Sequence, residues 1–222
     1  MKREALFITT KLWNTEQGYE STLASFESSM KKLGIGYLDL YLMHWPRTYV
    51  YYDEYPQRMR ETWRAFEKLY KEGAVRAIGV SNFLEHHINT LMETAEVLPM
   101  VNQLEIHPGY NQQAIVDHCQ EHKIIVECWS PFASGKMFKE GSLLETLGKK
   151  YGKTPAQIAL RWHLQRGLLP LPKTVTPSRI KENIDIFDFE IDNEDVEKIT
   201  EMPESDFSGY HPDHIDFLKN LG

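Results

Sequence analysis

Six short apolar runs in this sequence each end in residues that could bind or react with a ligand. They include a lysine and a histidine, which can carry charge or exchange protons, and amide side chains, which can hydrogen-bond. The groups are Thr9, Thr10 and Lys11; His44, Trp45 and Pro46; Ser81 and Asn82; Gln103 and Glu105 with His107 beyond; Trp129, Ser130 and Pro131; and Lys173 and Thr174. Polar residues belong in loops anyway, so one such residue carries little weight. Six together favour one shared site.

The apolar runs themselves are candidate strands, at residues 5–9, 37–43, 75–80, 100–104, 124–128 and 168–171. Several are apolar on both faces, as expected for strands covered by helices. Helical spacing of apolar residues predicts helices over residues 21–33, 57–70, 111–122, 143–151, 155–165, 178–183 and 193–201. Alternating strands and helices predict a parallel sheet, either open or closed as a barrel.

Two glycine-rich nucleotide-binding patterns, G-x-G-x-x-G and G-x-x-x-x-G-K-[ST], do not occur in the sequence. An open nucleotide-binding sheet usually carries such a turn after its first strand, so their absence favours a barrel. In a barrel the functional groups lie at the carboxyl ends of the strands, where the polar groups of this sequence are found.

A second kind of chemistry is suggested by His118, Glu121 and His122, which match the H-x-x-E-H pattern of inverted zinc peptidases. Two histidines four residues apart share a helix face and could bind Zn²⁺, with the glutamate as the base. The segment falls in a crossover helix whose outer face is solvated in a barrel, and no third ligand follows at a convincing spacing. The peptidase is therefore a remote alternative.

Composition excludes several classes of function. The chain has 222 residues, 41% hydrophobic and 26% charged, which suits one globular domain. Its net charge of −7 argues against a nucleic-acid partner. No apolar stretch reaches the ~20 residues that span a bilayer, so we expect no membrane partner. Two cysteines form no disulfide scaffold, which favours the cytoplasm.

Taken in order, the motifs resemble those of the aldo-keto reductases, which are NADPH-dependent carbonyl reductases. The segments are FITTKLW at residues 7–13, LDLYLMHWP at 38–46, IGVSNF at 78–83, NQLEIHP at 102–108, WSP at 129–131 and LPKTVTPSRIKEN at 171–183. The resemblance covers essentially the whole chain. It implies hydride transfer between NADP(H) and a small aldehyde or ketone.

The resemblance also implies catalytic and substrate-binding residues. Lys11 would lower the pKa of a catalytic tyrosine, which alone is a poor proton donor and base at neutral pH. His44 would orient the substrate carbonyl or help to protonate it. Trp13 and Trp45 would wall the substrate pocket. Structural roles remain open for His44 and for both tryptophans, which could belong to the core.

The cofactor-binding residues implied by the resemblance follow the later strands. The expected set is Ser81, Asn82 and Gln103 for the nicotinamide carboxamide; Trp129 for the nicotinamide ring; Ser130 and Phe132 for the pyrophosphate turn; Lys173, Thr174 and Arg179, with Val175 nearby, for the 2′-phosphate; and Glu182 and Asn183 for the adenine. Two cations suit a phosphate dianion better than a ribose hydroxyl, so NADPH is favoured over NADH. Arg179 could instead be a solvated helix charge.

The sequence departs from the family at its N-terminus, where the resemblance implies two further βα units with a catalytic aspartate and tyrosine. The predicted fold is therefore α/β, a (β/α)8 TIM barrel that lacks its first two βα units. Six parallel strands are present in a single incomplete domain, residues 1–222. We expect an impaired reductase, or alternatively a non-catalytic NADP-binding remnant. The open sheet edges would invite aggregation or swapping, whereas a complete barrel would be monomeric.

The substrate itself is not named by the sequence. The tail, residues 205–222, carries aromatic and histidine side chains that suggest a lid over the pocket: Phe207, Tyr210, His211, His214 and Phe217. Small aldehydes, keto-sugars and dicarbonyls all remain possible substrates.

Overall fold

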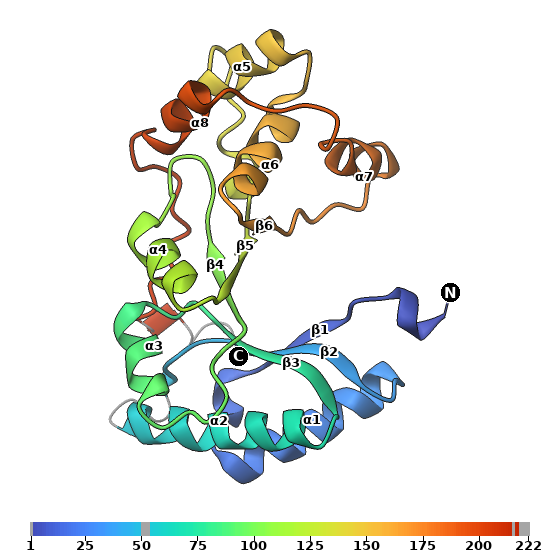
Figure 1. The fold of residues 1–222 in the computed structure, drawn as a ribbon, viewed down its shortest axis with the longest axis vertical. Helices are drawn as coiled ribbons and strands as arrows, with labels where there is room; N and C mark the ends of the chain where they lie inside the picture. Colours follow the sequence, from blue (N-terminus) through green and yellow to red (C-terminus); the bar gives the residue numbers. More distant parts are fainter. Residues whose placement is uncertain (1, 50–53, 215, 218–222) are drawn as a thin grey trace. The chain divides into compact units, whose positions relative to one another are not determined.

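The computed structural model describes residues 2–49, 54–214 and 216–217, and its strands form one sheet. The six strands follow the order β1-β2-β3-β4-β5-β6, so each strand neighbours the next one along the chain (Figure 1). The chain divides into two compact units, with the division inside β4. Unit 1 comprises residues 1–102, 121–124 and 210–222, and unit 2 comprises residues 103–120 and 125–209. None of the described helices is long and apolar enough to cross a membrane.

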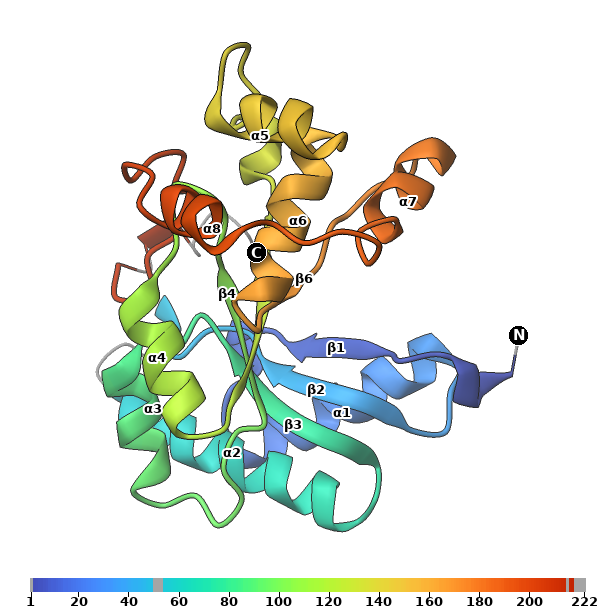
Figure 2. The same cartoon turned by 45° about the horizontal axis from the view of Figure 1, so that its top comes forward.

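Unit 1 contains three strands and three helices. The strands are β1 (Thr9–Leu12), β2 (Leu38–Met43) and β3 (Val75–Ser81), and both neighbouring pairs are parallel. The helices are α1 (Tyr19–Leu33), α2 (Tyr55–Lys71) and α3 (Glu85–Met92). Helices α1 and α2 lie along one face of these strands (Figures 1 and 2).

Strand β2 is buried along its whole length, because apolar groups cover both of its faces. Leu40 and Leu42 pack with Val101 on one face. On the other face the Tyr41 ring stacks on Phe66 of α2, with 4.5 Å between ring centroids. This two-sided burial is the arrangement expected of a parallel strand covered by helices.

Gly79 of β3 shows how closely the strands approach one another. A Cβ atom at this position would lie 2.5 Å from the carbonyl oxygen of Val101 and 2.8 Å from a methyl group of Leu42. Backbone oxygen cannot yield as a flexible side chain can, so the position requires glycine.

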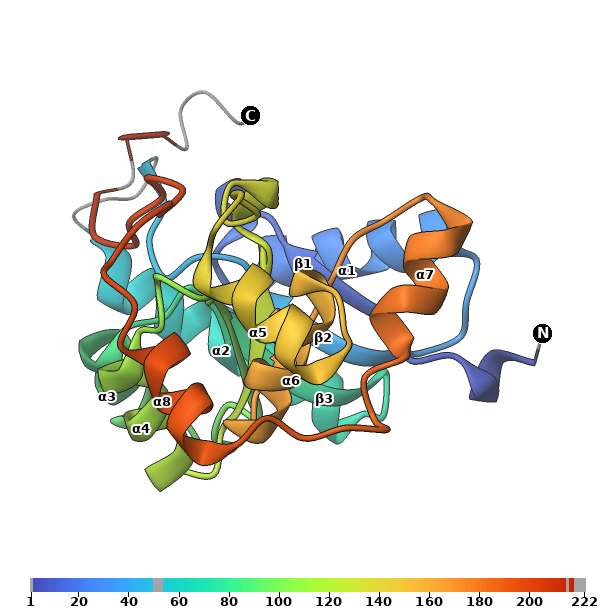
Figure 3. The same ribbon diagram turned by 90° about the horizontal axis from the view of Figure 1, so that it is seen from above.

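Unit 2 contains most of β4 (Val101–Glu105), with β5 (Ile125–Trp129) and the short strand β6 (Leu169–Pro170), which pairs in parallel with β5. Its helices are α4 (Gln113–Glu121), α5 (Leu143–Tyr151), α6 (Pro155–Gln165), α7 (Pro177–Ile184) and α8 (Asn193–Thr200). Helices α5 and α6 lie side by side (Figure 3).

Helix α6 begins where its sequence predicts. The Thr154 hydroxyl accepts the backbone N–H of Gln157, and the Gln157 side chain accepts the backbone N–H of Thr154. This capping box, followed by Pro155 at the first helical position, satisfies donors that a helix start otherwise leaves unpaired. Inside the helix, the buried His163 ring lies 2.9 Å from the carbonyl oxygen of Ile106 and so ties α6 to the end of β4.

Two elements differ from the sequence-based prediction. The first strand was expected at residues 5–9 but runs over Thr9–Leu12, with Arg3–Ala5 forming a short 3-10 helix. Strand β2 begins at Leu38, and its first backbone hydrogen bonds to this segment end on the carbonyl oxygen of Ile8. The paired register with β2 therefore begins at Thr9, and Arg3 contacts β2 through its side chain, which pairs with Asp39. Helix α3 was not predicted, because no regular apolar pattern was assigned to its eight residues.

Asp195 joins the start of α8 to α5 and yields a test of this part of the fold. Its carboxylate is almost fully buried and accepts hydrogen bonds from Lys150 (2.6 Å), Lys198 (2.7 Å) and the Tyr151 hydroxyl (2.8 Å). These partners hold the pKa of Asp195 below its ordinary value of 3.8.

We expect Asp195→Asn to lower the free energy of unfolding by about 1–3 kcal/mol, since hydrogen bonds to a charged group are lost. Urea denaturation would measure this loss. The stability that the charged Asp195 carboxylate gives to the native protein should be fully present above the ordinary aspartate pKa of 3.8. It should be lost as the pH falls through the lowered pKa of Asp195 in the folded state. Asp188→Asn, at an exposed carboxylate paired with Lys153, is the matched control and should cost less. Equal losses in the two variants would refute the assignment.

Candidate active site and cofactor cavity

His44 lies directly after β2, among aromatic side chains of unit 1. The Trp13 ring meets it edge-on with 5.2 Å between ring centroids, and the Trp45 ring is stacked with it at 6.2 Å. The three predicted residues therefore meet in one place. Trp45 is 4% exposed, while Trp13 and His44 are partly buried, which leaves the imidazole partly accessible beside two apolar rings.

Lys11 lies near His44 because β1 and β2 pair in parallel. In the register of this pair, Lys11 is opposite Leu42 and Leu12 is opposite Met43, so Lys11 lies one strand over from the residues that lead to His44. Burial and, to a smaller extent, the positive charge of Lys11 together lower the pKa of His44 to about 4. The imidazole is therefore neutral at pH 7 and can donate or accept a hydrogen bond without carrying charge.

Ser81 and Asn82 are buried at the end of β3 and are fixed by local contacts. Asn82 has a left-handed backbone, φ 61°, and its amide donates to the carbonyl oxygen of His44 (3.1 Å) and to the Ser81 hydroxyl (3.2 Å). The chain therefore turns sharply after β3 and ties its end to the end of β2. Polar groups of both strand ends gather here, as predicted.

In unit 2, Gln103 lies in the middle of β4, and Trp129 is the last residue of β5. The buried Gln103 amide donates to the Glu127 carboxylate at 2.7 Å, which fixes its orientation. Trp129 ends β5 and is partly buried.

The turn after β5 has an unusual backbone. Ser130, Ala133 and Ser134 all have positive φ angles, of 52°, 46° and 55°. The backbone N–H groups of Ala133 and Gly135 donate to the carbonyl oxygens of Ser130 and Phe132, which closes the turn on itself. The predicted pyrophosphate residues, Ser130 and Phe132, lie in this tight turn.

A cavity of about 660 Å³ lies beside this turn, entirely within unit 2. Its walls come from the turn, from the start of α6 and from the segment that leads into α7. Six residues predicted from the sequence line it: Phe132, Lys173, Thr174, Arg179, Glu182 and Asn183. Val175 is 80% exposed and does not line the cavity.

Lys173 and Arg179 are cations without a carboxylate partner among the residues that the structure describes. The one acidic wall residue, Glu182, instead accepts a hydrogen bond of 2.6 Å from the Thr154 hydroxyl. Two available positive charges at the start of a helix suit an anionic group such as a phosphate. The donor set therefore fits the phosphate of a dinucleotide.

Sequence reasoning did not select Ser134, Gly135, Phe138, Thr154, Pro155 and Ala156, which complete the cavity wall. The helix-start signal at Thr154 had been recognised, but nothing local indicated that the start of α6 would face α7. His118, Glu121 and His122 do not appear as a metal-ligand group, since the described side chains that could converge on an ion are His86, His87 and Asp213.

Comparison with known proteins places this geometry in context. Residues 1–204 match the Aldo/keto reductase family. The chain is similar to glyoxal reductase of Bacillus subtilis, 47% identical over 97% of this chain and 75% of the relative. It is also similar to methylglyoxal reductase DkgA of Escherichia coli K12, 43% identical over 97% of this chain and 76% of the relative.

Solved structures of the same family are also similar to this chain. One is the structure of a Gox0644 variant in complex with NADPH, which is 40% identical to this chain and has a TM-score of 0.88. The match covers 97% of this chain and 77% of the Gox0644 chain. The aldo-keto reductase neighbours are (β/α)8 barrels, which agrees with the predicted fold class. The ordered motifs, the sequence relatives and the structural neighbours lead to one conclusion: the chain belongs to the aldo/keto reductase family.

Proposed function

We propose that this chain reduces small aldehydes or ketones to alcohols, with NADPH as the hydride donor. The observation that carries the proposal is His44, a neutral imidazole in contact with the rings of Trp13 and Trp45 and close to Lys11. The relatives named glyoxal and methylglyoxal reductases support dicarbonyls as the substrate class.

The catalytic roles follow from where charge develops. NADPH supplies a hydride to the carbonyl carbon, and the carbonyl oxygen then gains negative charge. His44 would donate a hydrogen bond to that oxygen and orient it, while Trp13 and Trp45 exclude water from the reacting group. Lys11 would keep the surroundings electropositive. The proton is assigned by the family resemblance to a tyrosine, and no matching Asp-Thr-Ala and Tyr segment occurs in these 222 residues.

The cofactor would use residues at both of its ends. We assign the carboxamide to Ser81, Asn82 and Gln103, and the nicotinamide ring to Trp129. The pyrophosphate is assigned to Ser130 and Phe132, the 2′-phosphate to Lys173, Thr174 and Arg179 with Val175 nearby, and the adenine to Glu182 and Asn183. Support for NADP(H) comes from the neighbour solved with NADPH and from Lys173 and Arg179, two cations that line the cavity and have no carboxylate partner in the described part of the chain.

The proposal is tested first by separating binding from turnover. We expect residues 1–222 to bind NADPH, measured by its fluorescence. Aldehyde-dependent oxidation should be ~10²–10⁴-fold slower than in a reductase with its general acid in place. Binding with no turnover at all would identify an NADP-binding remnant. Full turnover would refute the requirement for the tyrosine segment, and a failure to bind NADPH would refute the cofactor assignment.

The 2′-phosphate site is tested by Lys173→Met. Losing one charged partner of the phosphate should weaken NADPH binding about tenfold and leave NADH binding unchanged, because NADH lacks the phosphate. Fluorescence titration of both cofactors measures the two affinities. Lys149→Met removes an exposed lysine that pairs with Glu145 outside the cavity and serves as the matched control. Equal weakening for NADPH and NADH would contradict the assignment.

The influence of Lys11 on His44 can be measured directly. In Lys11→Met we expect the His44 pKa to rise from about 4, because a nearby positive charge is gone, but to stay below its ordinary value of 6.5 because burial remains. NMR titration of the imidazole signals measures both proteins. The pKa of His87, lowered to about 3 by burial and by His86 and Arg47, should not move and is the internal control. An unchanged His44 pKa would rule out the proximity of Lys11.

A further inference from the structure

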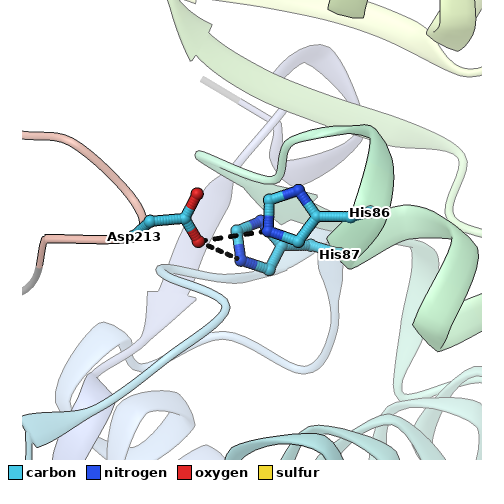
Figure 4. Close-up of side chains that lie close together, drawn as sticks. All are labelled: His86, His87 and Asp213. Carbon is cyan, nitrogen blue, oxygen red and sulfur yellow. Dashed lines mark hydrogen bonds and ion pairs between the residues drawn. The ribbon is translucent and has the colours of Figure 1, made fainter.

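Asp213, in the C-terminal segment of unit 1, contacts two consecutive histidines at the start of α3. Its Oδ1 atom lies 3.1 Å from Nε2 of His86 and 3.2 Å from Nε2 of His87, and Figure 4 shows both rings pointing toward it. The Arg47 guanidinium reaches the same oxygen at 3.6 Å. Burial raises the pKa of Asp213, but His87, His86 and Arg47 outweigh this and lower it overall. The carboxylate is thus charged at neutral pH.

The His87 ring has a defined protonation state. It is fully buried, and its Nδ1 accepts the backbone N–H of Leu84 at 3.1 Å, which caps α3. Its pKa is lowered to about 3, so the ring is neutral and carries one proton. With Nδ1 acting as an acceptor, that proton sits on Nε2, which lies 3.2 Å from Asp213 Oδ1 but is not aligned for a hydrogen bond, so this contact is electrostatic.

These contacts favour a direct clamp over a metal site, although the three ligand atoms lie within 4.8 Å of one another. A metal would need the lone pair of His87 Nε2, yet this nitrogen holds the ring proton. Metal-bound histidines donate their second N–H to an acceptor, whereas Nδ1 here faces the donor N–H of Leu84. The Arg47 charge on the same carboxylate oxygen would also repel a cation.

The clamped segment leads to the aromatic cluster beside His44. A local turn holds Asp213, whose backbone N–H donates to the His211 ring at 3.2 Å. Four residues after Asp213, the Phe217 ring meets Trp45 edge-on with 5.0 Å between centroids. Tyr210, three residues before Asp213, also packs against Phe217, with 4.9 Å between ring centroids.

We propose that Asp213 is a positioning residue for the substrate pocket. By fixing the tail to the start of α3, it holds Phe217 against Trp45, so that Phe217 becomes a wall of the pocket that receives the carbonyl. The wall is apolar and aromatic, which suits the carbon end of a small aldehyde. The part of this inference that concerns substrate rests on the proposed function, whereas the clamp itself does not.

Fluorine NMR of protein labelled with fluorotryptophan tests the clamp without any turnover. The Trp45 signal is assigned with Trp45→Phe, and the other tryptophan signals report whether each variant is folded. Phe217→Ala should shift the Trp45 signal because a neighbouring ring is lost. Asp213→Asn should shift the Trp45 signal in the same direction. The double variant, Asp213→Asn with Phe217→Ala, should show no shift beyond that of Phe217→Ala alone. His86→Gln, a milder change at a half-exposed ring, should shift it less.

The matched control is Glu93→Gln, which removes an exposed ion pair between the end of α3 and Arg60 but touches no residue of the tail. It should leave the Trp45 signal in place. A native Trp45 signal in Asp213→Asn would overturn the proposal. So would a saturable shift of the His87 signals by stoichiometric zinc that Asp213→Asn abolishes, since it would replace the clamp with a metal site.

Carbonyl binding is followed by the same Trp45 signal, with 4-nitrobenzaldehyde titrated into the protein and NADP⁺. If Asp213→Asn leaves Phe217 in place for about a tenth of the time, the dissociation constant should rise about tenfold. An unchanged constant despite a shifted signal would overturn the assignment of Phe217 as a wall. If the native protein binds no aldehyde, the proposed substrate class fails, while the Trp45 signal still decides the clamp.

Discussion

The parallel pairing of β1 with β2 is the constraint on which the candidate active site depends. It places Lys11 opposite Leu42, so the lysine charge lies within reach of the histidine that follows β2. A shift of Lys11 by one position along β1 would turn its side chain to the other face of the sheet, because side chains alternate along a strand. The pairing in turn needs β2 to be buried on both faces, which Leu40 and Leu42 on one side and Tyr41 on the other achieve.

Burial and charge act in the same direction at His44, and this has a chemical consequence. Desolvation disfavours the imidazolium, and so does the neighbouring Lys11. A charged imidazole would be repelled by the nearby lysine. A neutral imidazole is not repelled, and it can still donate a hydrogen bond to an oxygen that gains negative charge. The proposed phosphate site in unit 2 differs, because its charged groups are not buried. Lys173 and Arg179 are exposed, so they keep their charge at little cost until an anion arrives.

Much of this was readable from the sequence because it is local. The buried run of β2 and the capping signal at Thr154 each depend on a few adjacent residues, and both elements lie where they were predicted. The first strand was misplaced because Leu6 and Phe7 look like strand residues but have no partner in β2, and both are exposed. Apolar character alone does not reveal register, which depends on where the neighbouring strand begins.

The His86, His87 and Asp213 cluster could not have been predicted, because 127 positions separate His86 from Asp213 and helix α3 itself was missed. Adjacent helix residues normally point about 100° apart, so two consecutive histidines do not suggest a shared partner. They share one here because His87 turns back to cap its own helix while its other nitrogen faces the tail.

The cap of α3 and the hold on the tail are therefore physically linked through one imidazole. As long as Leu84 donates to Nδ1, the proton of His87 stays on Nε2, 3.2 Å from Asp213 Oδ1. The carboxylate also lies near the positive end of the α3 dipole, which favours its charged form. Fraying of the first turn of α3 would release the ring, let the proton move to Nδ1 and weaken the contact with the tail. The order of the aromatic residues around Trp45 thus depends on the stability of the start of α3.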